Sequence, residues 1–119
     1  KRNHLTILTD RHLLRRVFDN LLSNAIKFSP RGKQVFVEAE GNDQNVFIHF
    51  RDEGPGIPQD ELKNLFQKYT KASTRPTAGE LSTGLGLSIV KRIMEELNGE
   101  VSCNSQVGSG SVFTVKIKR

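Results

Sequence analysis

The sequence contains no tryptophan, a single tyrosine and one cysteine, Cys103. One cysteine cannot form a disulfide within the chain, and it fits a reducing compartment, where we expect it to serve packing. No stretch approaches the roughly 18–20 apolar residues of a membrane-spanning helix, and no signal peptide is visible. Zinc-ligand spacings and aromatic RNA-binding motifs are also missing. These absences argue against direct membrane contact and against nucleic acid as a partner.

The chain has 119 residues, of which 35% are hydrophobic, and a formal net charge of +5. This length and composition predict one compact domain over residues 1–119. The positive charge favours anionic partners such as nucleotide phosphates or an acidic protein. Because the chain runs almost at once into a strand-like segment, we expect it to be part of a longer protein.

The hydrophobic pattern predicts helices alternating with strands. A helix should run from a cap at Thr9 or Asp10 to about Phe28. The other predicted helices span residues 59–66 and 85–97, and the predicted strands span residues 5–8, 34–40, 46–52, 100–104 and 111–118. Strand 34–40 should be half-buried through Val35, Val37 and Ala39. The helix after the loop should bury a stripe of Leu85, Ile89, Ile93, Met94 and Leu97. Strands joined mostly by hairpins, together with three helices, indicate an α+β two-layer sandwich.

The first predicted helix carries an unusual polar face. Its apolar face comprises Leu14, Phe18, Leu21, Leu22 and Ala25. Asn20, Asn24 and Lys27 lie four and three residues apart, so they share another face. Asparagine is a poor helix former because its amide competes for backbone hydrogen bonds. Two amide oxygens and an ammonium group on one face suit a magnesium ion that carries a polyphosphate. A solvated polar face is the alternative for this helix taken alone.

Two glycine-containing segments also suggest ligand contacts. In Asp52–Pro58 a carboxylate precedes a tight turn, and it could accept the exocyclic amine of adenine. An ordinary turn is the alternative. Ser82–Ser88 places glycines at the start of a helix, where free amides bind phosphate. This segment is neither a GxGxxG nor a GxxxxGK[ST] motif. Residues 68–83 show little apolar periodicity and are predicted to form a mobile loop.

In this order and spacing, the segments resemble the catalytic ATP-binding domain of bacterial two-component sensor histidine kinases. Residues 20–30 resemble the asparagine box, residues 52–58 the first glycine box and residues 83–87 the second glycine box. Residues 65–69 resemble the phenylalanine box, with Tyr69 in place of its second phenylalanine. Ser82 stands where many members have glycine. The resemblance implies a Bergerat-type fold, with a mixed sheet of about five strands covered on one face by three helices.

The resemblance assigns the phosphate end of an ATP or ADP site. It implies that Asn24 binds Mg²⁺, that Asn20 lies near the metal or the phosphates, and that Lys27 neutralises phosphate charge. Asn24 and Lys27 would thereby serve catalysis. Residues 68–83 would form the ATP lid, and Gly84 and Gly86 would let this lid fold at the phosphates.

The resemblance also assigns the adenine end. Phe28 would pack on the ring, Asp52 would accept the amine, and Gly54 and Gly56 would let the loop approach the base. Other residues implied to bind the nucleotide are Ile57, Tyr69, Thr83, Leu85 and Leu87.

Asn20 distinguishes this sequence from hydrolytic relatives of the same fold. Gyrase, heat-shock and mismatch-repair ATPases place a glutamate four residues before the metal-binding asparagine, and an amide cannot replace that general base. Asp19 is turned about 100° around the helix from Asn20. The sequence therefore favours phosphoryl transfer to histidine over hydrolysis.

The acceptor histidine is expected elsewhere. His4, His12 and His49 lack the helical context of a phosphoacceptor. The implied partners are an upstream dimerisation domain that carries this histidine and, indirectly, a response regulator. The expected location is the cytoplasm. A nucleotide-binding or docking module without kinase activity is the alternative function.

Overall fold

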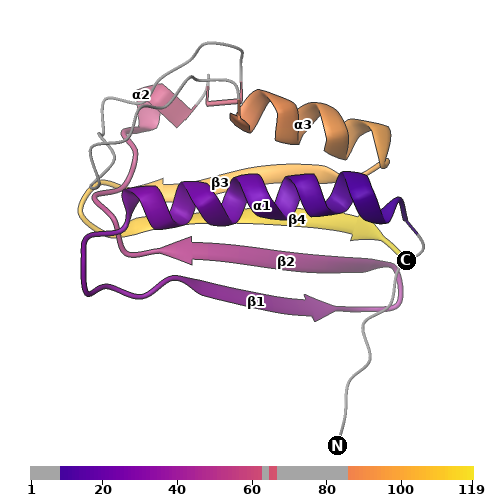
Figure 1. The fold of residues 1–119 in the computed structure, drawn as a ribbon, viewed down its shortest axis with the longest axis horizontal. Helices are drawn as coiled ribbons and strands as arrows, with labels where there is room; N and C mark the ends of the chain where they lie inside the picture. Colours follow the sequence, from indigo (N-terminus) through magenta and orange to yellow (C-terminus); the bar gives the residue numbers. More distant parts are fainter. Residues whose placement is uncertain (1–8, 63–64, 67–85) are drawn as a thin grey trace, which may run out of the picture.

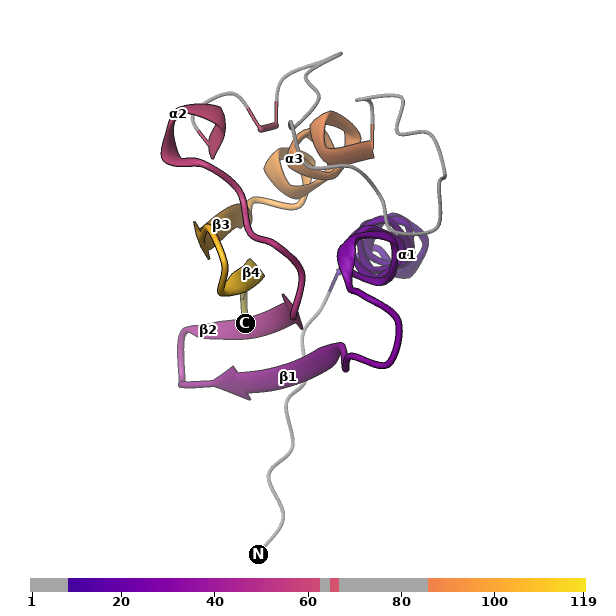
Figure 2. The same cartoon turned by 90° about the vertical axis from the view of Figure 1, so that its left-hand side faces the viewer.

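The computed structural model describes residues 9–62, 65–66 and 86–119. The helices are α1 (Arg11–Phe28), α2 (Gln59–Leu62) and α3 (Gly86–Glu96), and the strands are β1 (Phe36–Gly41), β2 (Asn45–Asp52), β3 (Glu100–Gln106) and β4 (Gly110–Lys118). Figure 1 shows α1 and α3 lying along one face of the sheet, and Figure 2 shows α2 on the same side near β3. The predicted α+β two-layer architecture is confirmed. Among the described residues, no helix combines the length and apolar character needed to cross a bilayer.

The four described strands form one sheet in the order β1-β2-β4-β3, and each neighbouring pair is antiparallel. The predicted hairpin of β1 and β2 is confirmed. Its turn is closed by Asn42, whose Oδ1 accepts hydrogen bonds from the Gln44 and Asn45 amides at 2.8 and 2.9 Å. The strand predicted at residues 5–8 lies outside the described residues, so a fifth strand and a mixed sheet stay predictions.

Helix α1 begins where the sequence predicts. Asp10 is its N-cap, and the Asp10 carboxylate accepts a hydrogen bond from the Leu13 amide at 3.0 Å, which satisfies one free donor of the first turn. The prediction for Leu22 is wrong, because its side chain is 38% exposed. Val17 and Leu21 lie one turn apart and are fully buried, and the centre of this packed face is about 120° around the helix from Leu22.

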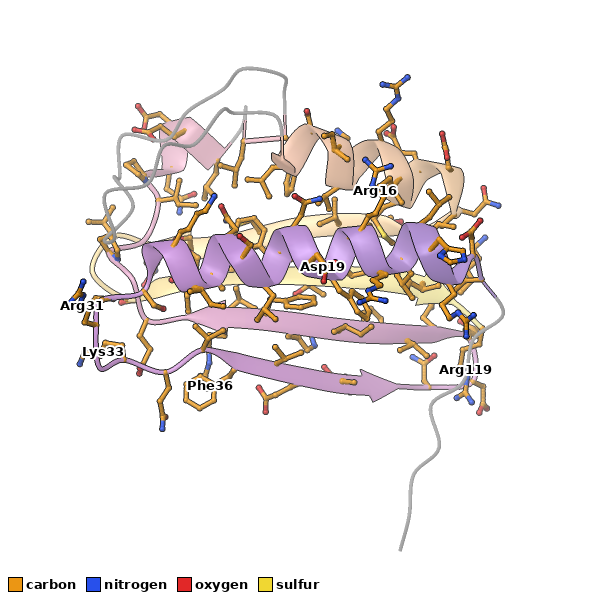
Figure 3. All side chains as sticks on the ribbon, in the orientation of Figure 1. Arg16, Asp19, Arg31, Lys33, Phe36 and Arg119 are labelled. Atoms are coloured by element: carbon orange, nitrogen blue, oxygen red, sulfur yellow. The ribbon has the colours of Figure 1, made fainter. Side chains whose placement is uncertain are left out.

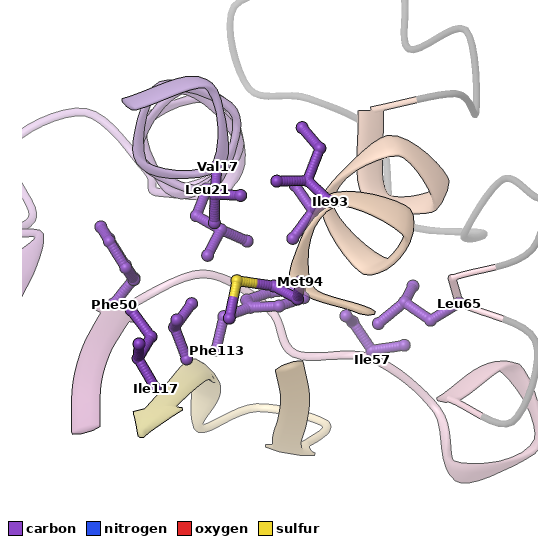
Figure 4. Packing of buried hydrophobic residues seen from close by; sticks show 11 residues of the cluster. Val17, Leu21, Phe50, Ile57, Leu65, Ile93, Met94, Phe113 and Ile117 are labelled. Carbon is purple, nitrogen blue, oxygen red and sulfur yellow. The ribbon is translucent and has the colours of Figure 1, made fainter. Parts of the chain in front are cut away.

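The core lies between the helices and the sheet (Figure 4). Helices α1 and α3 contribute side chains that meet aromatic and branched side chains of the central strands, β2 and β4. Its labelled members are Val17, Leu21, Phe50, Ile57, Leu65, Ile93, Met94, Phe113 and Ile117. Phe18 of α1 packs on Phe50 of β2 with ring centroids 5.6 Å apart, which fixes the helix above β2.

Two burial predictions need correction. The side of β1 that was expected to be half-buried is exposed at Ala39 and 52% exposed at Val37. The reason is that β1 is an edge strand among the described residues, while α1 packs over its neighbour β2. In α3, Val90 is fully buried although the predicted stripe omits it, and Ile93 and Met94 are buried as predicted.

Candidate functional site

Asp52 ends β2 in a buried position and is only 4% exposed. Its Oδ1 accepts a hydrogen bond from the Gly54 amide at 2.9 Å, and the Ser111 backbone also donates to the carboxylate. Burial raises the pKa of Asp52 above its ordinary value of 3.8, while these two hydrogen bonds act in the opposite direction. The site therefore contains one buried carboxylate held in a fixed orientation, which suits an acceptor for a neutral donor such as an amine.

The loop after Asp52 is fixed against the turn between β3 and β4. The Gly108 amide donates to the Pro55 carbonyl at 2.7 Å. Gly56 has φ +82°, and a Cβ at this position would collide with the backbone carbonyl of Gln106. Glycine is required here both by the dihedral angle and by the close approach. This agrees with the tight turn that the sequence predicts within Asp52–Pro58.

Ser29 joins the end of α1 to the same loop. Ser29 is the C-cap of α1, and its amide donates to the Ala25 carbonyl at 3.0 Å. Its hydroxyl accepts a hydrogen bond from the Glu53 amide at 3.3 Å. The last turn of α1, which carries Lys27, therefore lies beside the strand end that carries Asp52. Two segments that are 24 residues apart in the chain meet at this point.

Asn20 joins α1 to the start of α3. Its Nδ2 donates to the Arg16 carbonyl at 2.9 Å, so the amide is anchored to its own helix. Its Oδ1 faces α3, because a Cβ at Gly86 would lie 3.4 Å from that oxygen. Figure 3 shows Arg16 on the side of α1 toward α3 and Asp19 on the flank away from it. Asp19 is exposed.

Asn24 and Lys27 lie further along α1 and are half-buried. The Asn24 amide makes no hydrogen bond with another described residue, so its oxygen can accept a ligand. Within the described ranges, no group of three histidine, cysteine, aspartate or glutamate side chains could hold a metal. Mg²⁺ commonly uses only one or two protein ligands together with phosphates and water, so an amide oxygen beside a polyphosphate fits this donor set.

The structure places only part of the predicted site. Gly54 and Gly56 are buried in the loop that follows Asp52. Ile57 belongs to the core and Leu87 packs against it, so both side chains have structural contacts. Several predicted positions lie outside the described residues, namely Tyr69, Thr83, Gly84 and Leu85. The whole segment expected to form a lid, residues 68–83, lies outside them as well. The side chain of Phe28, at the end of α1, is likewise outside what is described.

Two histidines and the cysteine also lie among the described residues. The His49 ring bonds to Glu40 at 2.7 Å and to Thr114 at 2.9 Å. His49 and Glu40 line a hollow of about 360 Å³ together with Gly41, Asn42 and Phe47, toward the end of β2 opposite Asp52. His12 is exposed in the first turn of α1. Burial and then the Asp52 charge raise the pKa of Cys103 to about 12, which suits a packing role.

Sequence reasoning does not single out three serines that organise this site: Ser29, Ser105 and Ser111. Ser105 and Ser111 are 4% and 5% exposed and face the core side of the sheet. The sequence holds one indication of the role of Ser105, since Val101, Cys103 and Ser105 alternate along β3 and so share the inward face. A serine at an inward position needs hydrogen-bond partners. Their actual partners lie far away in the sequence, so the pattern alone does not name them.

Comparisons with known proteins agree with this arrangement. The family described as histidine kinase-, DNA gyrase B- and HSP90-like ATPases matches residues 9–119. The sensor-like histidine kinase SenX3 of Mycolicibacterium smegmatis is 40% identical over 114 residues, which cover 93% of this chain and 29% of that protein. The aerobic respiration control sensor protein ArcB of Escherichia coli is 38% identical over 117 residues, covering 93% of this chain and 14% of ArcB.

Two solved structures show the same architecture. The mycobacterial sensor histidine kinase MprB matches with a TM-score of 0.85 and 26% identity, over 94% of this chain and 76% of that one. Full-length ShkA in complex with AMPPNP matches with a TM-score of 0.79 and 31% identity, over 94% of this chain and 22% of ShkA. The chain spans less than a third of the length of SenX3 and of ArcB.

Proposed function

This chain belongs to the family of histidine kinase-, DNA gyrase B- and HSP90-like ATPases, as a sensor histidine kinase ATP-binding domain, and from that premise we propose that it binds Mg-ATP for phosphoryl transfer to a histidine. The observation that carries the proposal is the convergence of two segments on α1, the loop after Asp52 and the start of α3. Ser29 holds the end of α1 to the loop after Asp52, and Asn20 meets the start of α3 at Gly86.

The adenine end of the proposed site is centred on Asp52. Its carboxylate would accept the exocyclic amine of the base, since the Gly54 and Ser111 amides already hold it in place. The buried setting strengthens such a bond and excludes competing water. Guanine presents a carbonyl at the same ring position, and two acceptors would face each other. This arrangement supports adenine as the base.

The phosphate end would use the polar face of α1. The Asn24 oxygen is available to Mg²⁺, and Lys27 on the next turn would neutralise phosphate charge. The first backbone amides of α3 would meet the same phosphates, since a helix start favours negative charge. When bound, Mg²⁺ would neutralise charge on the phosphates and help to fix their geometry.

The chemistry we propose is phosphoryl transfer rather than hydrolysis. The imidazole nitrogen of the acceptor would form a bond to the γ-phosphorus as the bond to the bridging oxygen breaks, and ADP would leave. A neutral imidazole already has a lone pair, so this step requires no carboxylate base from the chain. Asn20 cannot act as that base, and Asp19 lies exposed away from α3.

The acceptor would be carried by a separate dimerisation domain, with a response regulator acting downstream. The support is that the relatives named above are longer proteins with sensor or kinase names. His12 and His49 are unsuited to this role, because one lies in the first turn of α1 and the other is bonded to Glu40 and Thr114. The domain would act in the cytoplasm, where ATP is available.

The test is transfer itself. The chain is mixed with the dimerisation domain of its own full-length protein, Mg²⁺ and γ-labelled ATP. We expect acid-labile label on the histidine of that domain. Release of labelled inorganic phosphate from ATP, with no label on any protein, would instead indicate an ATPase. Nucleotide binding without either product would favour a module that lacks kinase activity.

A further inference from the structure

The Ser105 hydroxyl is the centre of a buried hydrogen-bond network next to Asp52. It accepts a hydrogen bond from the Ile57 amide at 2.8 Å and donates one to the Gly110 carbonyl at 2.9 Å. The Ser111 hydroxyl lies 2.9 Å from the same oxygen. Because Ser105 is only 4% exposed, water cannot readily replace these contacts. One side chain therefore connects the loop after β2 to both strands of the β3–β4 hairpin.

Counting protons fixes the direction of each bond. A serine hydroxyl has one donor and two acceptor lone pairs. Ser105 uses its donor on the Gly110 carbonyl, so its remaining contacts, with the Ile57 amide and Ser111, must both donate to it. The proton of Ser111 is consequently directed at Ser105. The Ser111 oxygen is left with lone pairs only.

Ser111 lies directly opposite Asp52 in the register of β2 and β4, and its backbone amide donates to the Asp52 carboxylate. With its proton directed at Ser105, Ser111 would offer a ligand a second acceptor, because side chains directly opposite each other on an antiparallel pair are neighbours on one face. A ligand group that donates hydrogen bonds gains from two acceptors, whereas a carbonyl oxygen is repelled by both.

Further contacts tie the same loop to Ser105. The Gln59 side-chain amide donates to the Ser105 carbonyl at 3.0 Å. On the other side of Gly56, the Pro55 carbonyl accepts a hydrogen bond from the Gly108 amide. The loop is thus held before and after Gly56, and the bond from the Ile57 amide to Ser105 lies between these two ties.

We propose that Ser105 is a positioning residue that sets base selectivity. It holds the loop at Ile57 and orients the Ser111 hydroxyl so that the site around Asp52 offers acceptors to the base. The inference rests on the proposed binding of ATP and goes beyond it, because Ser105 acts through Ile57 and Ser111 and need not touch the nucleotide.

The test compares ATP with inosine triphosphate, which carries a carbonyl where adenine carries the amine. Affinities are measured by calorimetry with Mg²⁺ for the unmutated chain, Ser105→Ala and Ser105→Thr. In Ser105→Ala the preference for ATP should fall by about three- to tenfold, because the Ser111 proton is free to turn toward the base. Ser105→Thr retains the hydroxyl and should keep the preference. Ser102→Ala, at an exposed position on the same strand, is the matched control and should change nothing.

Two outcomes distinguish the role of Ser105 from the proposed binding of ATP. An unchanged ATP preference in Ser105→Ala, with normal folding, would overturn the positioning role alone. Equal affinity of the unmutated chain for both nucleotides would overturn the adenine assignment and this inference with it.

A second measurement serves if Ser105→Ala does not fold. Hydrogen exchange by NMR on the nucleotide-free, unmutated chain reports the Ile57 amide directly. Strong protection of Ile57 would support a loop held in advance by Ser105. Exchange of Ile57 as fast as the exposed Asp43 amide would show that Ser105 does not hold the loop, and would overturn the inference.

Discussion

Asp52 and Asn24 mark the two ends of the proposed nucleotide site, and the protein surrounds them differently. Asp52 is 4% exposed, and backbone amides of Gly54 and Ser111 bond to its carboxylate. Asn24 is half-buried, and its amide has no hydrogen-bond partner among the described residues. The carboxylate at the proposed adenine end is therefore held by the protein's own hydrogen bonds, whereas Asn24 at the proposed phosphate end presents an amide that a metal or phosphates would satisfy.

This difference predicts different consequences of mutation. Recognition of a base requires a fixed arrangement of acceptors, and buried hydrogen bonds supply it before the ligand arrives. Phosphates bring their own charge and counter-ion, so the chain need only supply ligands at suitable positions. Changes at Asp52 should act on affinity and base choice, while changes at Asn24 should act on transfer.

The largest effect is expected for Asn24→Ala and Asn24→Asp. Asn24→Ala removes the amide oxygen that would bind the metal, and Asn24→Asp places a negative charge beside the phosphates. In both variants phosphorylation of the dimerisation domain should fall by about 100-fold or more. Recognition of the adenosine end should survive, since Asn24 does not face the base. Ser23→Ala, at an exposed neighbouring position of α1, is the control. Normal phosphorylation of the histidine by either Asn24 variant would mean that this face of α1 is not the phosphate end.

Asp52→Asn should come next and should act on binding. Loss of a charge-assisted hydrogen bond costs about 1.5–3 kcal/mol, which corresponds to roughly ten- to 150-fold in ATP affinity. Calorimetry measures this loss, with Asp43→Asn in the exposed β1–β2 turn as a control for removal of a charge. If Asp52→Asn bound ATP as tightly as the unmutated chain, Asp52 would not be the acceptor.

Gly56→Ala should destabilise the adenine end through the backbone. Gly56 and Gly108 both have positive φ, at +82° and +87°, but only Gly56 lies against another backbone segment. Gly108→Ala should cost about 1–2 kcal/mol for the dihedral angle alone. Gly56→Ala should cost about 1–3 kcal/mol more, because the collision with Gln106 forces the loop to move. Denaturant unfolding gives the stability loss of each variant, and the difference between the two losses reports the contact of Gly56 with Gln106. Equal losses would argue against a loop packed on the β3–β4 hairpin.

The smallest expected effect is a pH dependence centred on Asp52. The pKa of Asp52 is raised in the folded protein, so its carboxyl group keeps a proton over a pH range in which the same group of the unfolded chain has lost it. As pH rises through that range, above the ordinary value of 3.8, this group should lower the free energy of unfolding. ATP affinity should rise over the same range, because the carboxylate is the better acceptor. Both trends should be absent in Asp52→Asn, and their persistence there would assign them to another group.

Much of the fold could be predicted because its signals are local. The Asp10 cap and the spacing of Leu21 and Ala25 specify α1 within one segment. The prediction for Val37 is wrong because burial of a strand depends on what covers it, and β1 is an edge among the described strands. Alternation along a strand states which side chains share a face and does not state which face is covered.

The residues of the site likewise fall into those that a local pattern predicts and those that it does not. Asn24 and Asp52 could be singled out because each stands within a distinctive local pattern. Ser105 could not be assigned its role, since its hydroxyl meets the Ile57 amide across 48 positions of the sequence. Ser29 meets Glu53 across 24 positions. Such contacts arise only when the loop after β2 folds onto the end of α1 and onto the terminal hairpin.

The most direct test of the central claim is calorimetric titration of the folded 119-residue chain with Mg-ATP and with Mg-GTP. The account predicts one ATP site per chain and at least tenfold weaker binding of GTP, because guanine places a carbonyl against the Asp52 carboxylate. No heat with ATP, or equal affinity for the two nucleotides, would contradict the proposed site.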